Sequence, residues 1–180
     1  MPYIRDKRSP KPKTEAVSRV MSANRPTDTK PEIQLRKALC HAGLRGYRLH
    51  RRIILDSPPY QGGVSAPRRR GGSLSVRPDI TYVSRKLAIF VHGYFWHRCP
   101  KCDFPLPKNN REFWKAKFAL NVERDNRQIM ALESTHWKVI VVWECETRSE
   151  LDDVVRKISR LNRLLAKSMR RRSDDPTIDY

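Results

Sequence analysis

The sequence has no long apolar run and few acidic side chains. No segment approaches the roughly 20 apolar residues of a membrane-spanning helix, and the start shows no apolar core of the signal-peptide kind. Only 19 Asp and Glu stand against 38 Lys and Arg, which gives a net charge of +19. Such an excess favours a polyanion, above all nucleic acid, over an anionic membrane surface. We therefore expect an intracellular protein without a membrane partner.

Cysteine is also scarce, with four residues in the chain. This number favours reduced thiols or metal ligands over a disulfide framework. Cys99 and Cys102 form a C-x-x-C pair, and Cys145 follows an expected strand, so these three can hold a structural zinc ion. The fourth ligand stays open between Cys40, Asp103, a nearby histidine and water. The alternatives are three reduced thiols without a metal, and for Cys40 a packed thiol within a helix.

The length of 180 residues suits one domain with tails. Residues 1–20 mix basic residues, Pro and Ser without apolar periodicity, which indicates a disordered basic arm that either follows phosphates or contacts nothing. The folded domain is expected over 21–166. A Gly-, Pro- and Arg-rich stretch over 56–76 indicates a loop or disordered insertion, and 167–180 indicates a disordered charged tail.

Apolar spacing predicts the regular elements of the domain. A helix begins at the capping-box pattern Thr29 to Glu32 and ends at Gly43. The next elements are one or two short strands over 47–55, a strand over 77–83, a hairpin turn at 84–86, a strand over 87–91, a helix over 110–133, a strand over 137–143, and a helix over 151–165 with Ser149 as its cap. This order predicts a single-domain α/β fold, in which helices flank a mixed β-sheet.

The stretch from Leu87 to Cys102 concentrates the chemically useful residues. Leu87 to Val91 is an apolar run typical of a strand buried on both faces, and His92 and His97 follow at its carboxyl end. Asp79, at the start of the neighbouring strand, brings a carboxylate to the same end of the sheet. A carboxylate suits a hard divalent ion, and histidine suits the base that phosphodiester cleavage requires. The alternative is that both histidines are structural.

Several separated motifs together resemble one family, the very-short-patch-repair (Vsr-type) DNA mismatch endonucleases. The resemblance covers about residues 21–148. The motifs are Asn24-Arg25, Asp28-Thr29, Pro31-Glu32, Arg77-Pro78-Asp79, His92-Gly93-Tyr94-Phe95-Trp96-His97, Phe113-Trp114-Lys115, Asn121-Val122-Glu123-Arg124-Asp125 and Val142-Trp143-Glu144-Cys145.

This resemblance implies a restriction-endonuclease-like fold, related to PD-(D/E)xK enzymes, and a magnesium-dependent nick in one DNA strand next to a T:G mismatch. Such mismatches arise when 5-methylcytosine deaminates. Asp79 is then the principal magnesium ligand, with the backbone carbonyl of Val91 helping. His97 is the general base or its close partner, while His92 and Glu32 order water and the scissile phosphate. Independently of the family, Glu32 also has a local explanation as the partner of Thr29 in the capping box.

The resemblance further implies how the chain grips DNA. Phe95, Trp96 and Trp114 form an aromatic wedge beside the mismatch, and the segment with Met21, Asn24 and Arg25 reaches across the duplex. Apolar wedges unstack base steps, and the free-energy cost of unstacking is lowest at a mismatched step. The alternative for Phe113 and Trp114 is a place in the helix core. The chain departs from the family at Tyr94, where a cysteine is frequent, and in its longer insertion before Asp79.

We therefore expect a cytoplasmic, nucleoid-associated enzyme that acts as a monomer on T:G-mismatched duplex DNA, with repair proteins as further partners. Two rival functions stay open. The first is a restriction-like or lesion-specific nuclease of the same fold. The second is a DNA-binding module without catalysis.

Overall fold

The computed structural model describes residues 14–23, 25–55 and 73–173. Predictions about Asn24, the first 13 residues, positions 56–72 and the last seven residues lie outside this described part. Its elements are α1 (Glu15–Ser22), α2 (Lys30–His41), β1 (Arg48–Leu49), β2 (Ile53–Leu55), β3 (Leu74–Val76), β4 (Ile80–Tyr82), η1 (Val83–Arg85), β5 (Leu87–His92), α3 (Arg111–Ser134), β6 (Lys138–Trp143), α4 (Glu144–Ser149) and α5 (Leu151–Ser173).

The main sheet has four strands in the order β1-β4-β5-β6. Strand β4 is antiparallel to both of its neighbours, whereas β6 runs parallel to β5. Helix α3 makes the crossover that a parallel pair requires. The expected mixed sheet is therefore confirmed, and β2 and β3 form a separate antiparallel ribbon.

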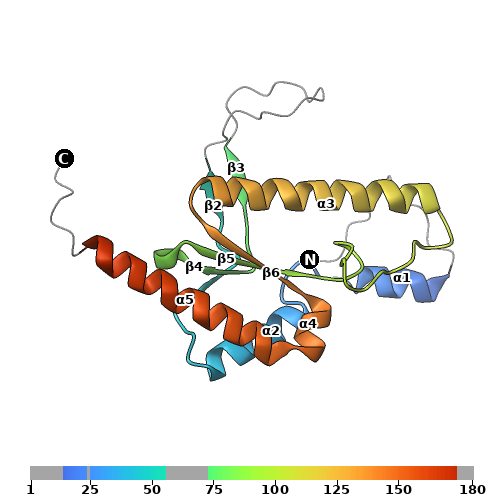
Figure 1. Cartoon of the computed structure of the whole chain (residues 1–180). Helices are drawn as coiled ribbons and strands as arrows, with labels where there is room; N and C mark the ends of the chain where they lie inside the picture. The colour runs from blue at the N-terminus through green and yellow to red at the C-terminus, as the bar shows by residue number, and fades with distance from the viewer. Residues whose placement is uncertain (1–13, 24, 56–72, 174–180) are drawn as a thin grey trace.

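Strand β5 is buried on both faces, as its apolar run predicts. Leu87 and Ile89 point into one apolar cluster, and Ala88 and Phe90 point into the other. The first cluster includes residues of α2 and α5, and the second includes residues of α3. Figure 1 shows the same layers, with α3 on one face of the sheet and α2, α4 and α5 on the other. The carboxyl end of β5 is thus fixed from both sides.

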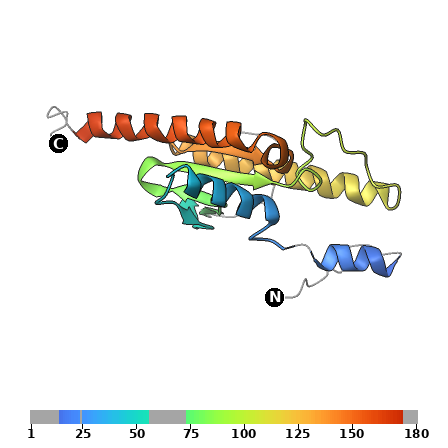
Figure 2. The same ribbon diagram turned by 90° about the horizontal axis from the view of Figure 1, so that it is seen from below.

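The structure differs from the sequence prediction at both ends of the chain. Helix α1 (Glu15–Ser22) overlaps the end of the expected disordered arm of residues 1–20, and it forms because this segment lacks Gly and Pro and has an acidic first turn. Figure 2 shows α1 apart from the sheet and its covering helices. Helix α5 continues into the expected tail as far as Ser173, through residues of good helix propensity such as Lys167 and Met169.

Two shorter elements also differ from the prediction. Leu74–Val76 lies within the expected insertion, yet it forms β3 and pairs with β2, which places Val76 in the core. A three-residue strand is too short to show a periodic pattern. Helix α4 was not expected, and it directly follows β6. In the described part of the chain, no helix is long and apolar enough to cross a membrane.

Candidate active site

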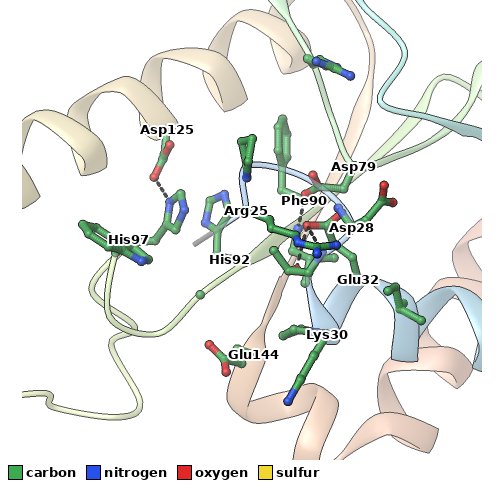
Figure 3. Close-up of a pocket in the computed structure, with 18 of the residues that line it drawn as sticks. Arg25, Asp28, Lys30, Glu32, Asp79, Phe90, His92, His97, Asp125 and Glu144 are labelled. Carbon is green, nitrogen blue, oxygen red and sulfur yellow. Dashed lines mark hydrogen bonds and ion pairs between the residues drawn. The ribbon is translucent and has the colours of Figure 1, made fainter. Parts of the chain in front are cut away.

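A cleft of about 860 Å³ opens at the carboxyl end of β5. The residues before β4, the start of α2, the turn after β5 and one face of α3 all line it. Figure 3 shows its acidic and imidazole side chains coming from both sides, with Arg25 between them. The charged and imidazole side chains that line it are Arg25, Asp28, Lys30, Glu32, Arg77, Asp79, His92, His97, Arg124, Asp125 and Glu144.

Asp79 lies at the inner wall of this cleft, immediately before β4. Its Oδ2 accepts a hydrogen bond of 2.7 Å from the backbone N–H of Val91. Its Oδ1 lies 3.8 Å from Nδ1 of His50, beyond hydrogen-bond distance. Burial raises the pKa of Asp79 to about 6, although the Val91 N–H opposes this, and the negative charge of Glu32 raises it further. A cation at Oδ1 would favour the ionised form of this carboxylate.

Glu32 caps the start of α2 from inside the fold. Its carboxylate accepts hydrogen bonds from the backbone N–H groups of Asp28 at 3.0 Å and Thr29 at 3.3 Å, and from the Thr29 hydroxyl at 2.7 Å. The local capping interpretation is therefore confirmed. The same carboxylate also lines the cleft, so a role in ordering water or phosphate remains a prediction compatible with the capping contacts.

His92 and His97 stack on each other, with ring centroids 4.1 Å apart. Burial, and then the neighbouring charge of His97, lowers the pKa of His92 to about 4, so this ring is neutral at pH 7. Nδ1 of His97 forms a short hydrogen bond with the carboxylate of Asp125 on α3. Figure 3 shows the two side chains pointing toward each other. Since the ionised carboxylate is an acceptor, Nδ1 donates, and in the neutral imidazole tautomer the free lone pair then lies on Nε2, which can accept a proton.

Asp125 stays ionised in this pair. Burial of Asp125 acts to raise its pKa, but the hydrogen bond from His97 and the positive charges nearby outweigh burial and lower the pKa. Helix α3 holds the turn after β5 at a second point, because the Asn121 amide donates to the Trp96 carbonyl at 3.1 Å. Asn121 and Asp125 lie four residues apart and therefore on one face of the helix. Helix α3 thus fixes the orientation of His97.

The aromatic residues of the predicted wedge form one partly exposed cluster. Phe95 packs edge-to-face against Trp96, with centroids 5.1 Å apart, and against Trp114 at 5.9 Å. Trp96 lines the cleft, as does Arg25 of the predicted arm. Met21 lies in α1, and Asn24 is outside the described residues. The structure therefore brings Trp96 and Arg25 to the cleft, whereas the roles of all these residues on DNA stay predictions.

Three thiols meet where the turn after β5 approaches α4. The sulfur atoms of Cys99, Cys102 and Cys145 lie within 4.8 Å of one another, and those of Cys99 and Cys145 are 3.7 Å apart. Burial, together with the two neighbouring thiols, raises the pKa of Cys145 to about 12. No fourth Cys, His, Asp or Glu of the described residues joins this group. Cys40 lies exposed beside the Tyr47 hydroxyl, so its prediction as a packed thiol is wrong.

Two residues of the site were not singled out from the sequence. Asp125 belongs to a motif of the resemblance but was given no role, although its spacing from Asn121 is a usable signal. His50 was missed entirely. It lies within 4 Å of Asp28, Glu32 and Asp79, and no sequence pattern connects the end of a two-residue strand with these positions.

The mixed sheet, the buried carboxylate and the His–Asp pair in a partly basic cleft define a DNA endonuclease of the restriction-endonuclease-like fold. The model of the family described as "DNA mismatch endonuclease Vsr" matches residues 60–103 of the chain. The chain belongs to the Vsr family, and its relatives include type II nicking enzymes and a DNA mismatch endonuclease.

Three relatives illustrate this membership. The type II nicking enzyme V.NaeI of Lentzea aerocolonigenes is 38% identical over 146 residues, which are 81% of this chain and 76% of the relative. The type II nicking enzyme V.XorIIP of Xanthomonas oryzae pv. oryzae is 34% identical over 163 residues, 91% of this chain and 98% of the relative. The DNA mismatch endonuclease Vsr of Escherichia coli is 42% identical over 81 residues, 45% of this chain and 52% of the relative.

Proposed function

We propose that this endonuclease nicks one strand of duplex DNA next to a T:G mismatch, in a magnesium-dependent reaction, and that it acts as a monomer. The observation that carries the proposal is the convergence of Asp79, the His97–Asp125 pair and Trp96 on one cleft. The relationship to a DNA mismatch endonuclease supports the choice of substrate. The nick would begin very short patch repair, with repair proteins acting afterwards.

Asp79 and the carbonyl of Val91 are the proposed magnesium ligands. Oxygen donors suit this ion, and the N–H of Val91 takes only Oδ2 of Asp79, which leaves Oδ1 available. When bound, magnesium stabilises the negative charge of the phosphate and makes water a better nucleophile. Val91 lies in β5 and Asp79 immediately precedes β4. Because these two strands are hydrogen-bonded to each other, their pairing fixes the separation of the two residues.

The proposal assigns proton transfer to the imidazoles. His97 accepts it at Nε2, because its Nδ1 is hydrogen-bonded to Asp125. His92 is neutral and stacks on His97, so it can order water and the scissile phosphate by hydrogen bonds. Glu32 contributes from the opposite wall of the cleft, where its capping contacts hold it.

The partly exposed aromatic cluster supports recognition of a defective base step. The proposal places Phe95, Trp96 and Trp114 in the stack beside the mismatch, where unstacking costs least. Arg25, together with Met21 and Asn24, belongs to the arm that reaches across the duplex. Positive side chains at the cleft, such as Lys30 and Arg124, suit the phosphates on either side.

The proposal includes a structural zinc ion. Cys99, Cys102 and Cys145 offer the soft sulfur ligands and the mutual spacing that zinc needs, with the fourth ligand open. Because Cys99 and Cys102 follow His97 in the chain, and Cys145 lies in the first turn of α4, the ion would connect the segment after β5 to the end of β6.

A restriction-like nicking specificity is the second candidate. It is favoured by one observation, that the relatives with the larger coverage are named type II nicking enzymes. Such an enzyme would select a sequence or lesion other than T:G.

A panel of duplexes separates these functions. Matched, T:G and other mismatched duplexes of one sequence, with each strand labelled in turn, are incubated with the protein and magnesium or with EDTA. We expect a nick in one strand of the T:G duplex, with magnesium present. Asp79→Ala and His97→Ala should lower the rate at least about 100-fold, while binding measured with calcium changes little.

The panel can also overturn the proposal. Equal cutting of all duplexes would remove the mismatch specificity and favour the type II candidate. If wild-type protein cuts none of the duplexes, the chain binds DNA without catalysis. Full activity in EDTA would remove the magnesium requirement.

A further inference from the structure

His50 lies behind the carboxylates of the cleft. Its Nδ1 is 3.8 Å from Oδ1 of Asp79, and its Nε2 is 3.7 Å both from Oε2 of Glu32 and from Oδ1 of Asp28. The side chain is only 14% exposed. His50 is thus the one described imidazole within 4 Å of both Asp79 and Glu32.

The backbone holds His50 in this place. The register of β1 on β4 sets Leu49 opposite Ile80, so the next residue along β1 meets Asp79. The N–H of His50 donates to the Asp79 carbonyl at 3.1 Å, and the His50 carbonyl accepts from Nε of Arg77 at 2.9 Å. His50 also has a positive φ of 47°, a conformation uncommon for residues other than glycine. Such a conformation persists only where its surroundings enforce it.

The imidazole has hydrogen-bonding capacity that the described residues do not use. Nε2 is buried and has no hydrogen-bond partner among them. A buried nitrogen without a partner costs free energy, so such a group in a native site calls for an explanation. The separations of 3.8 Å from Asp79 and 3.7 Å from Glu32 exceed a hydrogen bond by less than about 1 Å.

We propose that His50 is a positioning residue of the nuclease site, which orients the Asp79 and Glu32 carboxylates from behind with one ring nitrogen toward each. The inference rests on the proposed role of Asp79 as a metal ligand. With Oδ2 of Asp79 fixed by the Val91 N–H, contact of His50 with Oδ1 determines the remaining rotation of this carboxylate. Groups that hold metal ligands in this way typically change metal affinity about 10- to 100-fold when they are removed.

The test compares His50→Ala, His50→Gln and the matched control His41→Ala, an exposed histidine at the end of α2. Asp79→Asn serves as the reference. Binding of Mn²⁺ alone is measured by isothermal titration calorimetry, the half-saturating magnesium concentration from nicking rates, duplex binding in EDTA by fluorescence anisotropy, and stability by thermal unfolding.

We expect His50→Ala to weaken Mn²⁺ binding about 10- to 100-fold and to raise the half-saturating magnesium concentration in proportion. DNA binding in EDTA should stay near wild type. His50→Gln retains a donor and should recover most of the affinity, and His41→Ala should match wild type.

Unchanged Mn²⁺ affinity in His50→Ala would overturn the inference. Equal losses in His50→Ala and His50→Gln would also overturn it, because packing alone would then explain the effect. If His50→Ala does not fold, His50→Gln is decisive, since a 10-fold loss in a folded protein with this conservative change contradicts the proposed rescue. Should Asp79→Asn keep wild-type Mn²⁺ affinity and nicking, the proposed metal site fails instead, and that result is distinct from a failure of His50.

Discussion

Asp79 has a position that lowers the stability of the folded protein and suits the proposed binding of a metal ion. Its carboxylate is largely buried, receives one backbone hydrogen bond and lies in the field of Glu32. Burial and this negative charge make the ionised form costly in the absence of a cation. The same position lets one oxygen face the cleft. A residue placed for metal binding is therefore expected to destabilise the fold near neutral pH.

This cost predicts a pH-dependent gain in stability for Asp79→Asn. The pKa of Asp79 in the folded protein, about 6, lies above the ordinary aspartate value of 3.8. Between these values the folded state binds more protons than the unfolded state, so wild-type stability falls as pH rises toward 6 and stays lowered above it. A neutral Asn at position 79 avoids this loss of stability. In EDTA at pH 8 the variant should be more stable by up to about 3 kcal/mol, with no gain near pH 4, although it no longer nicks.

Urea unfolding at several pH values measures this difference. The control is Asp152→Asn, which changes an exposed aspartate in the first turn of α5 and should show no comparable gain. A variant at position 79 that is less stable than wild type at pH 8 would show that Asp79 stabilises the fold, contrary to the prediction.

At the residue scale, the positions of Asp79, His92 and His97 can be predicted because these residues lie next to strand ends in the sequence. Asp79, His92 and His97 meet because antiparallel β4 and β5 are joined by a short turn. Asp125 and His50 join them through the packing of α3 and through the pairing of a two-residue strand. The pairing that places His50 has no local signature, and the four-residue spacing of Asn121 and Asp125 marks one helix face without identifying His97 as the partner of Asp125.

At the element scale, long periodic segments are predictable and short ones are not. Strands β5 and β6 and helix α3 appear close to their expected ranges, because burial repeats over enough residues to show a period. Strand β3 and helix α4 contain only three and six residues. Their positions depend on contacts with β2 and β6. The turn after β5 also depends on tertiary contacts, because Asn121 and Asp125 of α3 hydrogen-bond to it.

The proposed zinc site gives a prediction about that turn. Purified protein should contain about one zinc ion per chain, measured by mass spectrometry. Cys145→Ser should lose the ion and lower the free energy of unfolding by at least about 2 kcal/mol, because metal binding contributes directly to folding. Nicking should fall as well, since Cys99 and the turn with His97 are no longer tied to α4. Cys40→Ser is the control, because this exposed thiol lies outside the group.

A zinc-free wild-type protein, with stability and nicking unaffected by a strong chelator that spares magnesium, would contradict the zinc prediction. The three thiols would then be reduced side chains packed together, the alternative left open by the sequence.

At the scale of the whole molecule, charge determines how the protein finds and holds DNA. A net charge of +19 creates attraction for any duplex, whatever its sequence. Several of these charges have defined places, because Arg25, Lys30, Arg77 and Arg124 line the cleft around the acidic groups. The acidic groups repel phosphate until a cation is present, so the positive rim must supply the affinity in EDTA.

Salt dependence tests this distribution of charge. Four neutralised phosphates give a slope of about −3.6 in a plot of log K against log salt, so affinity for a matched duplex in EDTA should fall at least roughly 100-fold between 50 and 200 mM salt. Lys30→Ala should make the slope less steep by about 0.9, because each phosphate that the protein neutralises contributes that amount to the slope. Lys37→Ala, on the same helix but outside the cleft, should leave the slope unchanged. Equal slopes for all three proteins would place the DNA backbone away from the start of α2, and an affinity insensitive to salt would refute the electrostatic basis of binding.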